Sequence, residues 1–462
     1  MKKLTGLFLV LLLSLGLIKN TYCEVETEVE ALSDLEGNKN RLDDFLSQSE
    51  NLILDEKGRL KVKEGAHFVY VGDVMDRGPN SRKILEMLVD LKERQPNQVT
   101  LIAGNRDINK IRLALELNDE ALFRKRSERS KLPYFIGKSG GATYNSQTDT
   151  KINRLKWMLS ETLGAKDAFE FRRKELSSAK ATLVNDEEVY KSMLSDVESG
   201  GPMEKYLEHA EVSKIIDGNM FIHGAFNDEA YYALEKEFAQ GSLRKNLEEL
   251  NKKYKAAVDD YKKGKSTPLT DWLIAYQEPN KITPGRNNVS LVYSYYFVGD
   301  EQPEMPTAET QDKIKSEGIH RVLGGHSPQG SEGTLMKSNA LEIVVMDNSY
   351  ASHDKANLVR VQAQNMKMKG YEEGLGEITT QTKIGETSFL GKLTQDGYIV
   401  VGKTNDGHYF AKKRLPKHKI DTKLFTKEEL EKMTLQIPQK SKLAPEFLVQ
   451  CEAMLRALHR TN

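Results

Sequence analysis

Two carboxylates and an arginine directly follow a short apolar run in residues 68–78. The run Phe68 to Val71 is aromatic and β-branched, it stops at a glycine, and Asp73, Asp76 and Arg77 come next. Such a run predicts a buried strand, and open α/β sheets place their sites just beyond the carboxyl ends of strands. Because carboxylates hold cations and a guanidinium holds anions, the segment predicts a site that binds both.

The same pattern, a short apolar run that ends in glycine or in a metal-ligand residue type, recurs along the chain. The first run, Val29 to Ser33, contains Glu30 and is the least apolar of them. If the runs are strands whose ends meet at one edge of a sheet, their polar residues gather there. Mixed carboxylate, amide and imidazole ligands suit two clustered Mn, Fe or Zn ions. The candidate ligands are Asp34, Glu36, Asp73, Asn105, His223 and His326.

These motifs resemble those of the calcineurin-like metallophosphoesterases, in particular the phosphoprotein-phosphatase branch. Residues 72–78 resemble the family motif GDxxDRG, residues 34–37 its DxHG, and residues 104–107 its GNHE, while His223-Gly224 and residues 325–328 resemble its last two histidine motifs. The order and spacing agree from about Leu32 to about Ser349. Glutamate replaces the histidine of DxHG, and Arg-Asp replaces the His-Glu of GNHE, which indicates a divergent subgroup with DxEG and GNRD motifs.

The resemblance implies an α/β fold with a central β-sandwich flanked by helices, and a site with two divalent metal ions. Asp73 would bridge the ions, Asp34 and Glu36 would complete one, and Asn105, His223 and His326 would complete the other. Manganese is the expected metal, with Fe, Zn and Mg as alternatives, because Glu36 adds a hard oxygen where the family has histidine. A water held between the ions would attack phosphorus.

The expected catalytic residues are Asp76, Arg77 and Arg106, and Arg77, Arg106 and Asn105 are expected to bind the phosphate. Arg77 is expected to bind the phosphate bidentately, with Asn105 beside it. Arg106 occupies the place of the family's proton-donating histidine, and a guanidinium cannot usefully give up a proton. We therefore interpret Arg106 as a second phosphate clamp that is held by Asp76. The only nearby replacement acid that the sequence offers is His353.

The predicted function is a metal-dependent phosphomonoesterase, a protein phosphatase that prefers phosphotyrosine or other aryl phosphates. One alternative is a nucleotide or dinucleotide polyphosphate hydrolase. The other is an inactive module that binds phosphorylated partners, which the full ligand set disfavours. The 68 basic and 68 acidic residues balance, so no nucleic-acid partner is expected. Phosphorylated proteins or small phosphoesters are the expected partners.

Residues 1–23 have the features of a secretory signal peptide. Lys2 and Lys3 precede an apolar segment from Leu4 to Ile18, and acidic residues follow. The alternative is an uncleaved anchor helix, although the segment is short for a bilayer span. The chain is therefore expected to be exported, to a secreted, periplasmic or endomembrane location, with no stable membrane span in the mature form. Cys451 would then be its one thiol, in a buried structural role.

The elements that position the site follow from apolar periodicity. Residues 40–47 and 81–94 are predicted helices between the first strands, and residues 108–218 form a charged helical insertion in a catalytic domain at 27–355. Helices are expected at 108–126, 152–163, 205–216 and 230–263. The aromatic cluster Tyr293 to Phe297 is expected in the core. Strands at 388–393, 397–401 and 408–411 would form a small antiparallel meander within an extension at 356–414, and residues 415–462 a helical tail.

Overall fold

The structure is a computed structural model that describes residues 26–117, 123, 149–279, 287–298, 302–416, 419–440, 443 and 446–459. The predicted signal peptide, residues 1–23, lies outside these ranges, so cleavage and export stay predictions. Within the described part of the chain, no helix combines the length and the apolar character that a bilayer crossing requires.

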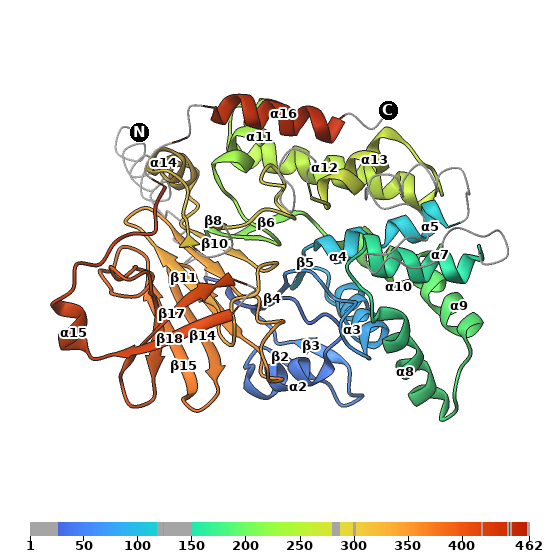
Figure 1. Cartoon of the computed structure of the whole chain (residues 1–462), viewed down its shortest axis with the longest axis horizontal. Helices are drawn as coiled ribbons and strands as arrows, with labels where there is room; N and C mark the ends of the chain where they lie inside the picture. Colours follow the sequence, from blue (N-terminus) through green and yellow to red (C-terminus); the bar gives the residue numbers. More distant parts are fainter. Residues whose placement is uncertain are drawn as a thin grey trace, which may run out of the picture.

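Two β-sheets form the centre of the molecule, with helices packed around them (Figure 1). The nine-stranded sheet has the order β18-β17-β16-β15-β14-β13-β1-β4-β5, and the five-stranded sheet has the order β11-β12-β10-β7-β6. The larger sheet contains β1 (Glu28–Leu32), β4 (Ala66–Tyr70), β5 (Val99–Leu101), β13 (Leu358–Gln362), β14 (Asn365–Glu372), β15 (Gly376–Lys383), β16 (Ile399–Thr404), β17 (Tyr409–Leu415) and β18 (Lys419–Phe425). The smaller sheet contains β6 (Ser213–Ile216), β7 (Asn219–Ile222), β10 (Arg321–Gly324), β11 (Thr334–Lys337) and β12 (Glu342–Val345).

Side chains alternate between the two faces of the central strand β4. Val69 packs in the apolar cluster between the two sheets, together with Phe221 of β7 and Val344 of β12. Phe68 and Tyr70 point to the other face and join the cluster that includes the helices. The strand is therefore packed on both faces, and each buried side chain of this size stabilises the fold by roughly 1.5–3 kcal/mol. The predicted β-sandwich is confirmed.

Glu30, which interrupts the apolar pattern of β1, is fully buried and paired. Its carboxylate lies 2.7 Å from Nη2 of Arg360 on the neighbouring strand β13. It also accepts hydrogen bonds from the backbone N–H groups of Glu50 and Asn51. A buried charge is tolerated when it is paired and hydrogen-bonded in this way, so the polar residue does not break the strand.

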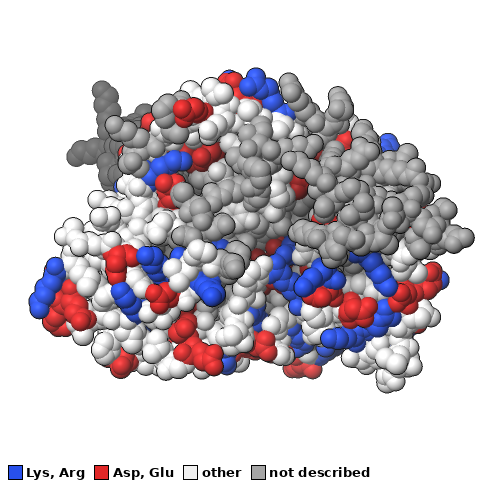
Figure 2. Space-filling model, in the orientation of Figure 1, with Lys and Arg blue, Asp and Glu red and all other residues white. Residues whose placement is uncertain are grey.

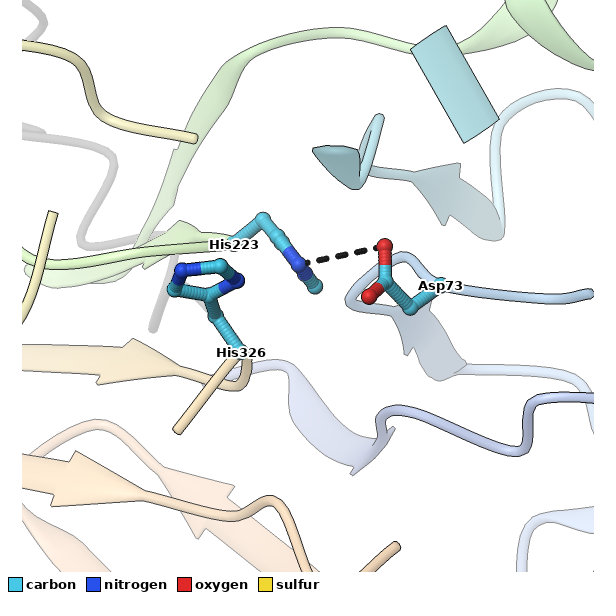
Figure 3. A group of neighbouring side chains, drawn as sticks. All are labelled: Asp73, His223 and His326. Atoms are coloured by element: carbon cyan, nitrogen blue, oxygen red, sulfur yellow. Dashed lines mark ion pairs between the residues drawn. The ribbon is translucent and has the colours of Figure 1, made fainter. Parts of the chain in front are cut away.

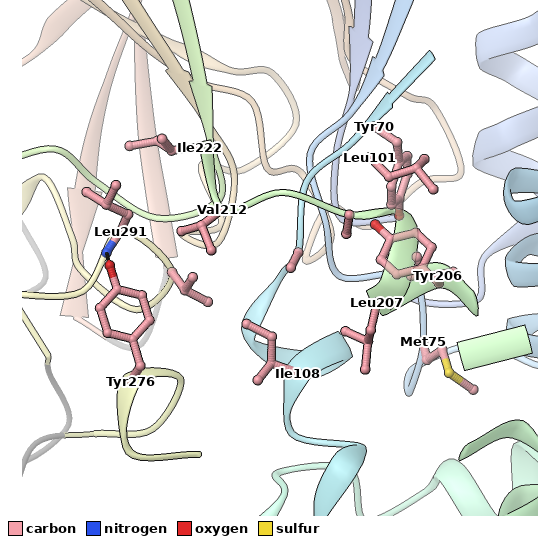
Figure 4. Packing of buried hydrophobic residues seen from close by; sticks show 14 of the residues in the cluster. Tyr70, Met75, Leu101, Ile108, Tyr206, Leu207, Val212, Ile222, Tyr276 and Leu291 are labelled. Atoms are coloured by element: carbon pink, nitrogen blue, oxygen red, sulfur yellow. Dashed lines mark hydrogen bonds between the residues drawn. The ribbon is translucent and has the colours of Figure 1, made fainter. Parts of the chain in front are cut away.

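The helices between the first strands confirm the sequence prediction. They are α2 (Lys39–Gln48) and α3 (Ser81–Arg94). The insertion that follows β5 is docked on the core, because the Tyr206 hydroxyl donates to the carbonyl of Ile102 at 2.9 Å and Leu207 is buried beside it (Figure 4). Its elements are α4 (Asn105–Ile108), α5 (Ile111–Glu116), α7 (Lys151–Trp157), the π-helix η2 (Met158–Thr162), α8 (Ala168–Lys180), α9 (Asp186–Val197) and α10 (Pro202–His209).

Four of the remaining helices, α11, α12, α13 and α16, pack on one another in a layer of their own. In it α16 (Phe447–His459) packs on α11 and α13, and Cys451 of α16 is free and buried, as expected. The other elements are α11 (Asp228–Phe238), α12 (Leu243–Lys262), α13 (Pro268–Tyr276), α14 (Ala308–Ser316), α15 (Lys427–Glu431) and the short strands β2 (Leu52–Leu54), β3 (Leu60–Val62), β8 (Phe297–Val298) and β9 (Gln302–Pro303). On the face shown in Figure 2, basic and acidic side chains of the described residues are interspersed.

Several predicted elements differ from the structure. The helix expected at 108–126 is interrupted, since α4 ends at Ile108 and α5 spans Ile111–Glu116, and residues 118–122 and 124–126 lie outside the described ranges. The helical stretch expected at 230–263 forms two helices, α11 and α12. The helix expected at 205–216 ends at His209, and Ser213–Ile216 is strand β6. The strand expected at 388–393 is instead a turn region, and β15 supplies the meander strand before it. The tail expected to be helical from 415 contains β18, whose residues are mostly exposed. The C-terminal strands are not a separate layer, because β13 pairs with β1 and so continues the central sheet.

Candidate metal centre and phosphate site

The candidate site lies where the carboxyl ends of six strands meet. Strands β1, β4 and β5 run parallel in one sheet, and β7, β10 and β12 run parallel in the other. Parallel strands bring residues that follow their carboxyl ends to one edge. The polar residues that follow these strands are Asp34, Glu36, Asp73, Asn105, His223, His326 and Asp347.

The backbone is strained where these loops leave their strands. Asp34, Glu36, Asp73, Asp76 and His326 all have positive φ, between 47° and 102°. Non-glycine residues adopt this region at a cost of roughly 1–3 kcal/mol, and such residues concentrate at functional sites. The surrounding structure therefore holds these side chains in fixed directions at a measurable energetic cost.

Four predicted ligands converge in a compact cluster. The ligand atoms of Asp73, His223 and His326 lie within 4.8 Å of one another (Figure 3). Nε2 of His223 is 3.2 Å from Oδ1 of Asp73. Oδ1 of Asn105 lies between the imidazoles, 3.2 Å from Nε2 of His223 and 2.9 Å from Nδ1 of His326. Such a group of carboxylate, amide and imidazole atoms can hold a divalent ion.

The electrostatics of the cluster depend on the close contact of Asp73 and His223. Burial opposes both charges, but His223 holds the pKa of Asp73 well below its usual range. Burial lowers the pKa of His223, but the Asp73 carboxylate outweighs it and raises that pKa to about 10. Burial, together with His223, lowers the pKa of His326 to about 3. Because metal ligation needs neutral imidazole, a cation must compete with the proton on His223.

Asp34 lies at the side of the cluster and holds the loop of His326. Its carboxylate oxygens accept the backbone N–H of His326 at 3.2 and 3.3 Å. Burial and the neighbouring Asp347 raise the pKa of Asp34 well above its usual value. Gly325 permits this approach, since a Cβ there would lie 2.1 Å from Oδ2 of Asp34. A divalent ion would relieve the repulsion among these buried carboxylates.

Glu36 faces the arginines, which the sequence did not predict. Its Oε1 lies 2.8 Å from Nε of Arg106 and 3.3 Å from Nε of Arg77. The expected partner of Arg106, Asp76, is 3.5 Å from its Nη1 and forms a closer pair with Lys110, at 2.7 Å. Arg106 therefore contacts Asp76, as predicted, but its shortest ion pair is with Glu36.

Lys110 is a component of the site that the sequence reasoning missed. The side chain is 2% exposed, and its Nζ donates to Asp76, to the carbonyl oxygen of Arg106 and to Oδ1 of Asn109. These bonds use its three N–H groups. Lys110 therefore fixes Asp76 and closes the turn after Arg106. In the sequence, only its spacing of one helical turn from Arg106 indicated that Lys110 could lie beside that residue.

Asp107 has a structural role in the same loop. Its Oδ2 accepts the N–H groups of Asp73 and Gly104, and its Oδ1 accepts the N–H of Val74, each at 2.9 Å. Burial and the charge of Asp73 raise the pKa of Asp107 to about 6. The carboxylate thus joins the two motif loops through their backbone.

Three tyrosines line the site. The rings of Tyr293 and Tyr295 lie 4.9 and 4.7 Å from the ring of His326, and the guanidinium of Arg77 lies 4.2 Å from the centre of the Tyr350 ring. Tyr293 and Tyr295 are half-buried, whereas their neighbours Tyr296 and Phe297 are buried. The expectation that the whole aromatic cluster belongs to the core is therefore corrected for Tyr293 and Tyr295.

Asp347 lines the site, and His353 does not supply an acid to it. Asp347 is 1% exposed, and burial raises its pKa. His353 has Nε2 2.9 Å from the carbonyl oxygen of Tyr371, and its Nδ1 accepts the N–H of Lys355 at 3.1 Å. Both ring nitrogens of His353 are therefore used by the backbone.

The donor set fits a divalent metal ion. Nε2 of His326 and Oε2 of Glu36 are buried and have no hydrogen-bond partner among the described residues. Buried polar atoms are nearly always paired, and leaving one unpaired costs roughly 1–3 kcal/mol. Both atoms are of types that bind Mn, Fe or Zn. The ligand roles of the six residues remain predictions, although the structure brings all of them to one site.

A β-sandwich whose strand ends carry carboxylates, histidines and an asparagine beside two arginines defines a metal-dependent phosphoester hydrolase. The chain matches the calcineurin-like phosphoesterase family over residues 31–330, and it belongs to that family.

Several solved structures are distantly similar to the chain. One is the cold-active protein-tyrosine phosphatase of a psychrophile, Shewanella sp., at 15% identity and a TM-score of 0.42, covering 78% of this chain and 80% of that one. A protein serine/threonine phosphatase from Saccharomyces cerevisiae has 10% identity and a TM-score of 0.34, with 80% and 84% covered. A metallophosphoesterase from Sphaerobacter thermophilus has 11% identity and a TM-score of 0.30, with 75% and 89% covered.

Proposed function

We propose that this protein is a metal-dependent phosphomonoesterase that acts on phosphotyrosine and other aryl phosphates. The observation that carries the proposal is the identity and pairing of Arg106. It stands beside Asp73, 3.6 Å away through its Nε, and it is held by Glu36. A permanently charged group at this point binds phosphate well and protonates a leaving group poorly.

Separate residues of the chain would bind the metal ions and the substrate phosphate. Asp34, Glu36, Asp73, Asn105, His223 and His326 would hold the cations. Bound cations would supply an activated water and neutralise the phosphoryl oxygens. Arg77 and Arg106 present two guanidiniums at the edge of the centre, where they can bind the phosphate oxygens.

The preference for aryl esters follows from the leaving group. The phenol of tyrosine has a pKa of about 10, so phenolate departs with little protonation. A serine alkoxide is far more basic and needs a proton donor in the transition state. Arg106 cannot supply that proton, the N–H groups of Lys110 are all used, and His353 is bound by the backbone.

The tyrosines provide a surface for an aromatic substrate. Tyr293 and Tyr295 contact the ring of His326, and Tyr350 stacks on Arg77. Aromatic rings prefer offset or edge contacts that contribute about 0.5–1.5 kcal/mol beyond burial. A phosphotyrosine ring placed among them would gain affinity that a phosphoserine side chain cannot.

The test compares turnover of matched phosphotyrosine and phosphoserine peptides by the full chain with Mn²⁺. We expect the preference for phosphotyrosine in kcat more than in KM, because the missing proton affects the transition state. Arg106→His should narrow the difference in turnover between the two peptides. Arg244→His should not, because Arg244 lies in α12, where its Nε donates to the carbonyl oxygen of Glu317. Tyr350→Phe should retain phosphotyrosine turnover, since the leaving phenolate needs no donor.

Equal turnover of the two peptides by the wild type would refute the proposed preference. Parallel assays with mononucleotides and dinucleotide polyphosphates test the alternative hypothesis that the protein is a nucleotide or dinucleotide polyphosphate hydrolase. Faster turnover of those substrates than of any phosphopeptide would replace the proposal with that alternative. Binding of phosphate and Mn²⁺ without hydrolysis of any ester would leave an inactive phosphate-binding module.

A further inference from the structure

The two carboxylate oxygens of Glu36 have different surroundings. Oε1 is within ion-pair distance of Nε of both Arg77 and Arg106. Oε2 is buried, without a hydrogen-bond partner among the described residues. One oxygen of the carboxylate thus pairs with two arginines and the other has no hydrogen-bond partner among the described residues, in a site that contains the ligand atoms of Asp73, His223 and His326.

Both arginines form an ion pair with the same oxygen. Nε of each lies within ion-pair distance of Oε1 of Glu36, and Nη1 of Arg106 also contacts Asp76 at 3.5 Å. Nη1 of Arg106 reaches the carbonyl oxygen of Gly164 at 3.3 Å, and the guanidinium of Arg77 stacks on Tyr350. Glu36 is 6% exposed and Arg106 is 12% exposed, so little water is available to replace this contact.

Glu36 and Arg106 are also two of the positions at which the sequence departs from the DxHG and GNHE motifs. They are far apart in the chain, yet their side chains contact each other at 2.8 Å. Replacing only one of them would remove the shortest ion pair of the other at a buried position. Arg106 would be left with Asp73 and Asp76 at 3.6 and 3.5 Å, or Glu36 with Arg77 at 3.3 Å, and weakening a buried ion pair is unfavourable. The two departures are therefore physically coupled, and each makes the other tolerable.

We propose that Glu36 is a shared positioning residue that couples metal binding to phosphate binding. Its Oε2 binds a divalent cation while its Oε1 holds Arg77 and Arg106 in place for a phosphoryl group. The cation and the phosphate then raise each other's affinity through this one side chain. The inference rests on the proposed function only in taking a phosphoryl group as the anion.

The experiment uses Mn²⁺ and inorganic phosphate as probes on the full chain. Calorimetry gives the Mn²⁺ affinity, and equilibrium dialysis gives the phosphate affinity with and without saturating Mn²⁺. Glu36→Gln should weaken both affinities by about tenfold or more, the effect of losing one charge-assisted contact. In a double-mutant cycle with Arg106→Gln, the effects on phosphate affinity should be clearly non-additive.

Two controls separate the coupling from general damage. Glu342→Gln removes a buried carboxylate that pairs with Arg321 at 2.7 Å, at the opposite end of β12 from Asp347, and it should leave both affinities unchanged. Glu36→Asp keeps the charge but shortens the side chain, and it replaces Glu36→Gln in the experiment if that variant does not fold. Restoring both motif histidines, Glu36→His with Arg106→His, should give tighter Mn²⁺ binding than either single change.

The proposal is overturned if Glu36→Gln alters only one of the two affinities, because Glu36 would then be a ligand alone or an anchor alone. Additive effects in the cycle would overturn it as well, and so would a single histidine variant that binds Mn²⁺ more tightly than the double. All readouts are binding equilibria. A wild type that shows the coupling but hydrolyses no ester would therefore refute the proposed function and leave this inference standing.

Discussion

The buried ammonium of Lys412 offers a sharp test of how the fold supports the centre. Lys412 is 3% exposed, and its Nζ donates to the carbonyl oxygens of Gln329, Glu332 and Gly333 at 2.7, 2.6 and 3.2 Å. It also lies 2.9 Å from the Glu332 carboxylate. These residues belong to the loop that connects His326 to β11, so β17 holds that loop from the other sheet.

Lys412→Met keeps the length of the side chain and removes every one of these contacts. Breaking a buried ion pair costs about 3–5 kcal/mol, because the remaining charge is left unpaired. Burial already raises the pKa of Glu332 to about 7, so this carboxyl can take up a proton in the variant and limit the loss. We therefore expect a loss of about 3 kcal/mol near pH 8 and a smaller loss near pH 6.

The assay is urea unfolding followed by circular dichroism at both pH values, with Mn²⁺ calorimetry on the same samples. Lys412→Met with Glu332→Gln should recover at least half of the lost stability, since no charge remains unpaired. Mn²⁺ affinity should fall in the single variant because the loop of His326 is loosened. A free energy of unfolding within about 0.5 kcal/mol of wild type, the range of ordinary surface changes, would refute the reasoning. So would an unchanged Mn²⁺ affinity in a clearly destabilised variant.

Three further predictions concern other parts of the molecule. Gly104→Ala places a Cβ 2.2 Å from Oδ1 of Asp73, so calorimetry should show Mn²⁺ affinity reduced about tenfold or more; unchanged affinity would contradict the tight fit. Lys110→Met should lower kcat on an aryl phosphate, because Asp76, which also contacts Arg106, loses its closest ion pair. A kcat equal to that of the wild type would show that Asp76 does not need Lys110 for its position. Burial lowers the pKa of His67 to about 4, so below about pH 6.5 the unfolded chain binds a proton that the folded chain does not. Stability should therefore fall from pH 6.5 towards pH 4, and His67→Gln should remove up to roughly 3 kcal/mol of that loss. If the urea midpoint shifts equally with pH in the wild type and in His67→Gln, the contribution of His67 to the pH dependence is excluded.

The position of the site could be predicted because it depends on local patterns. The apolar runs that end in Gly72 and Gly104 form β4 and β5, and the parallel arrangement brings their polar ends together. The contact of Glu36 with Arg106 could not be predicted, since it joins two loops and no periodicity encodes it. The sequence suggested Asp76 as the partner only because Asp76 belongs to the neighbouring motif.

Buried lysines and an exposed strand account for other differences. Lysine is almost never fully buried unless it is paired, so Lys412 gave no signal of its role, and for Lys110 the only signal was its spacing of one helical turn from Arg106. Strand β18 is an edge strand with mostly exposed residues, so it lacks the apolar alternation that identifies a half-buried strand. Tyr293 and Tyr295 resemble their buried neighbours in sequence, and only the loop conformation separates them.

The neighbours of β1 have a consequence for the order in which the protein is assembled during synthesis. One neighbour, β4, follows early in the chain, whereas the other, β13, begins at Leu358. Until the ribosome has made that segment, one edge of β1 has no partner and the Glu30 carboxylate has no guanidinium, and unpaired edges invite association between chains. His326 also emerges late, long after Asp34 and Asp73. A nascent chain therefore carries an acidic, incomplete half of the predicted centre until His326 has emerged, and the central sheet is closed only later, when β13 pairs with β1.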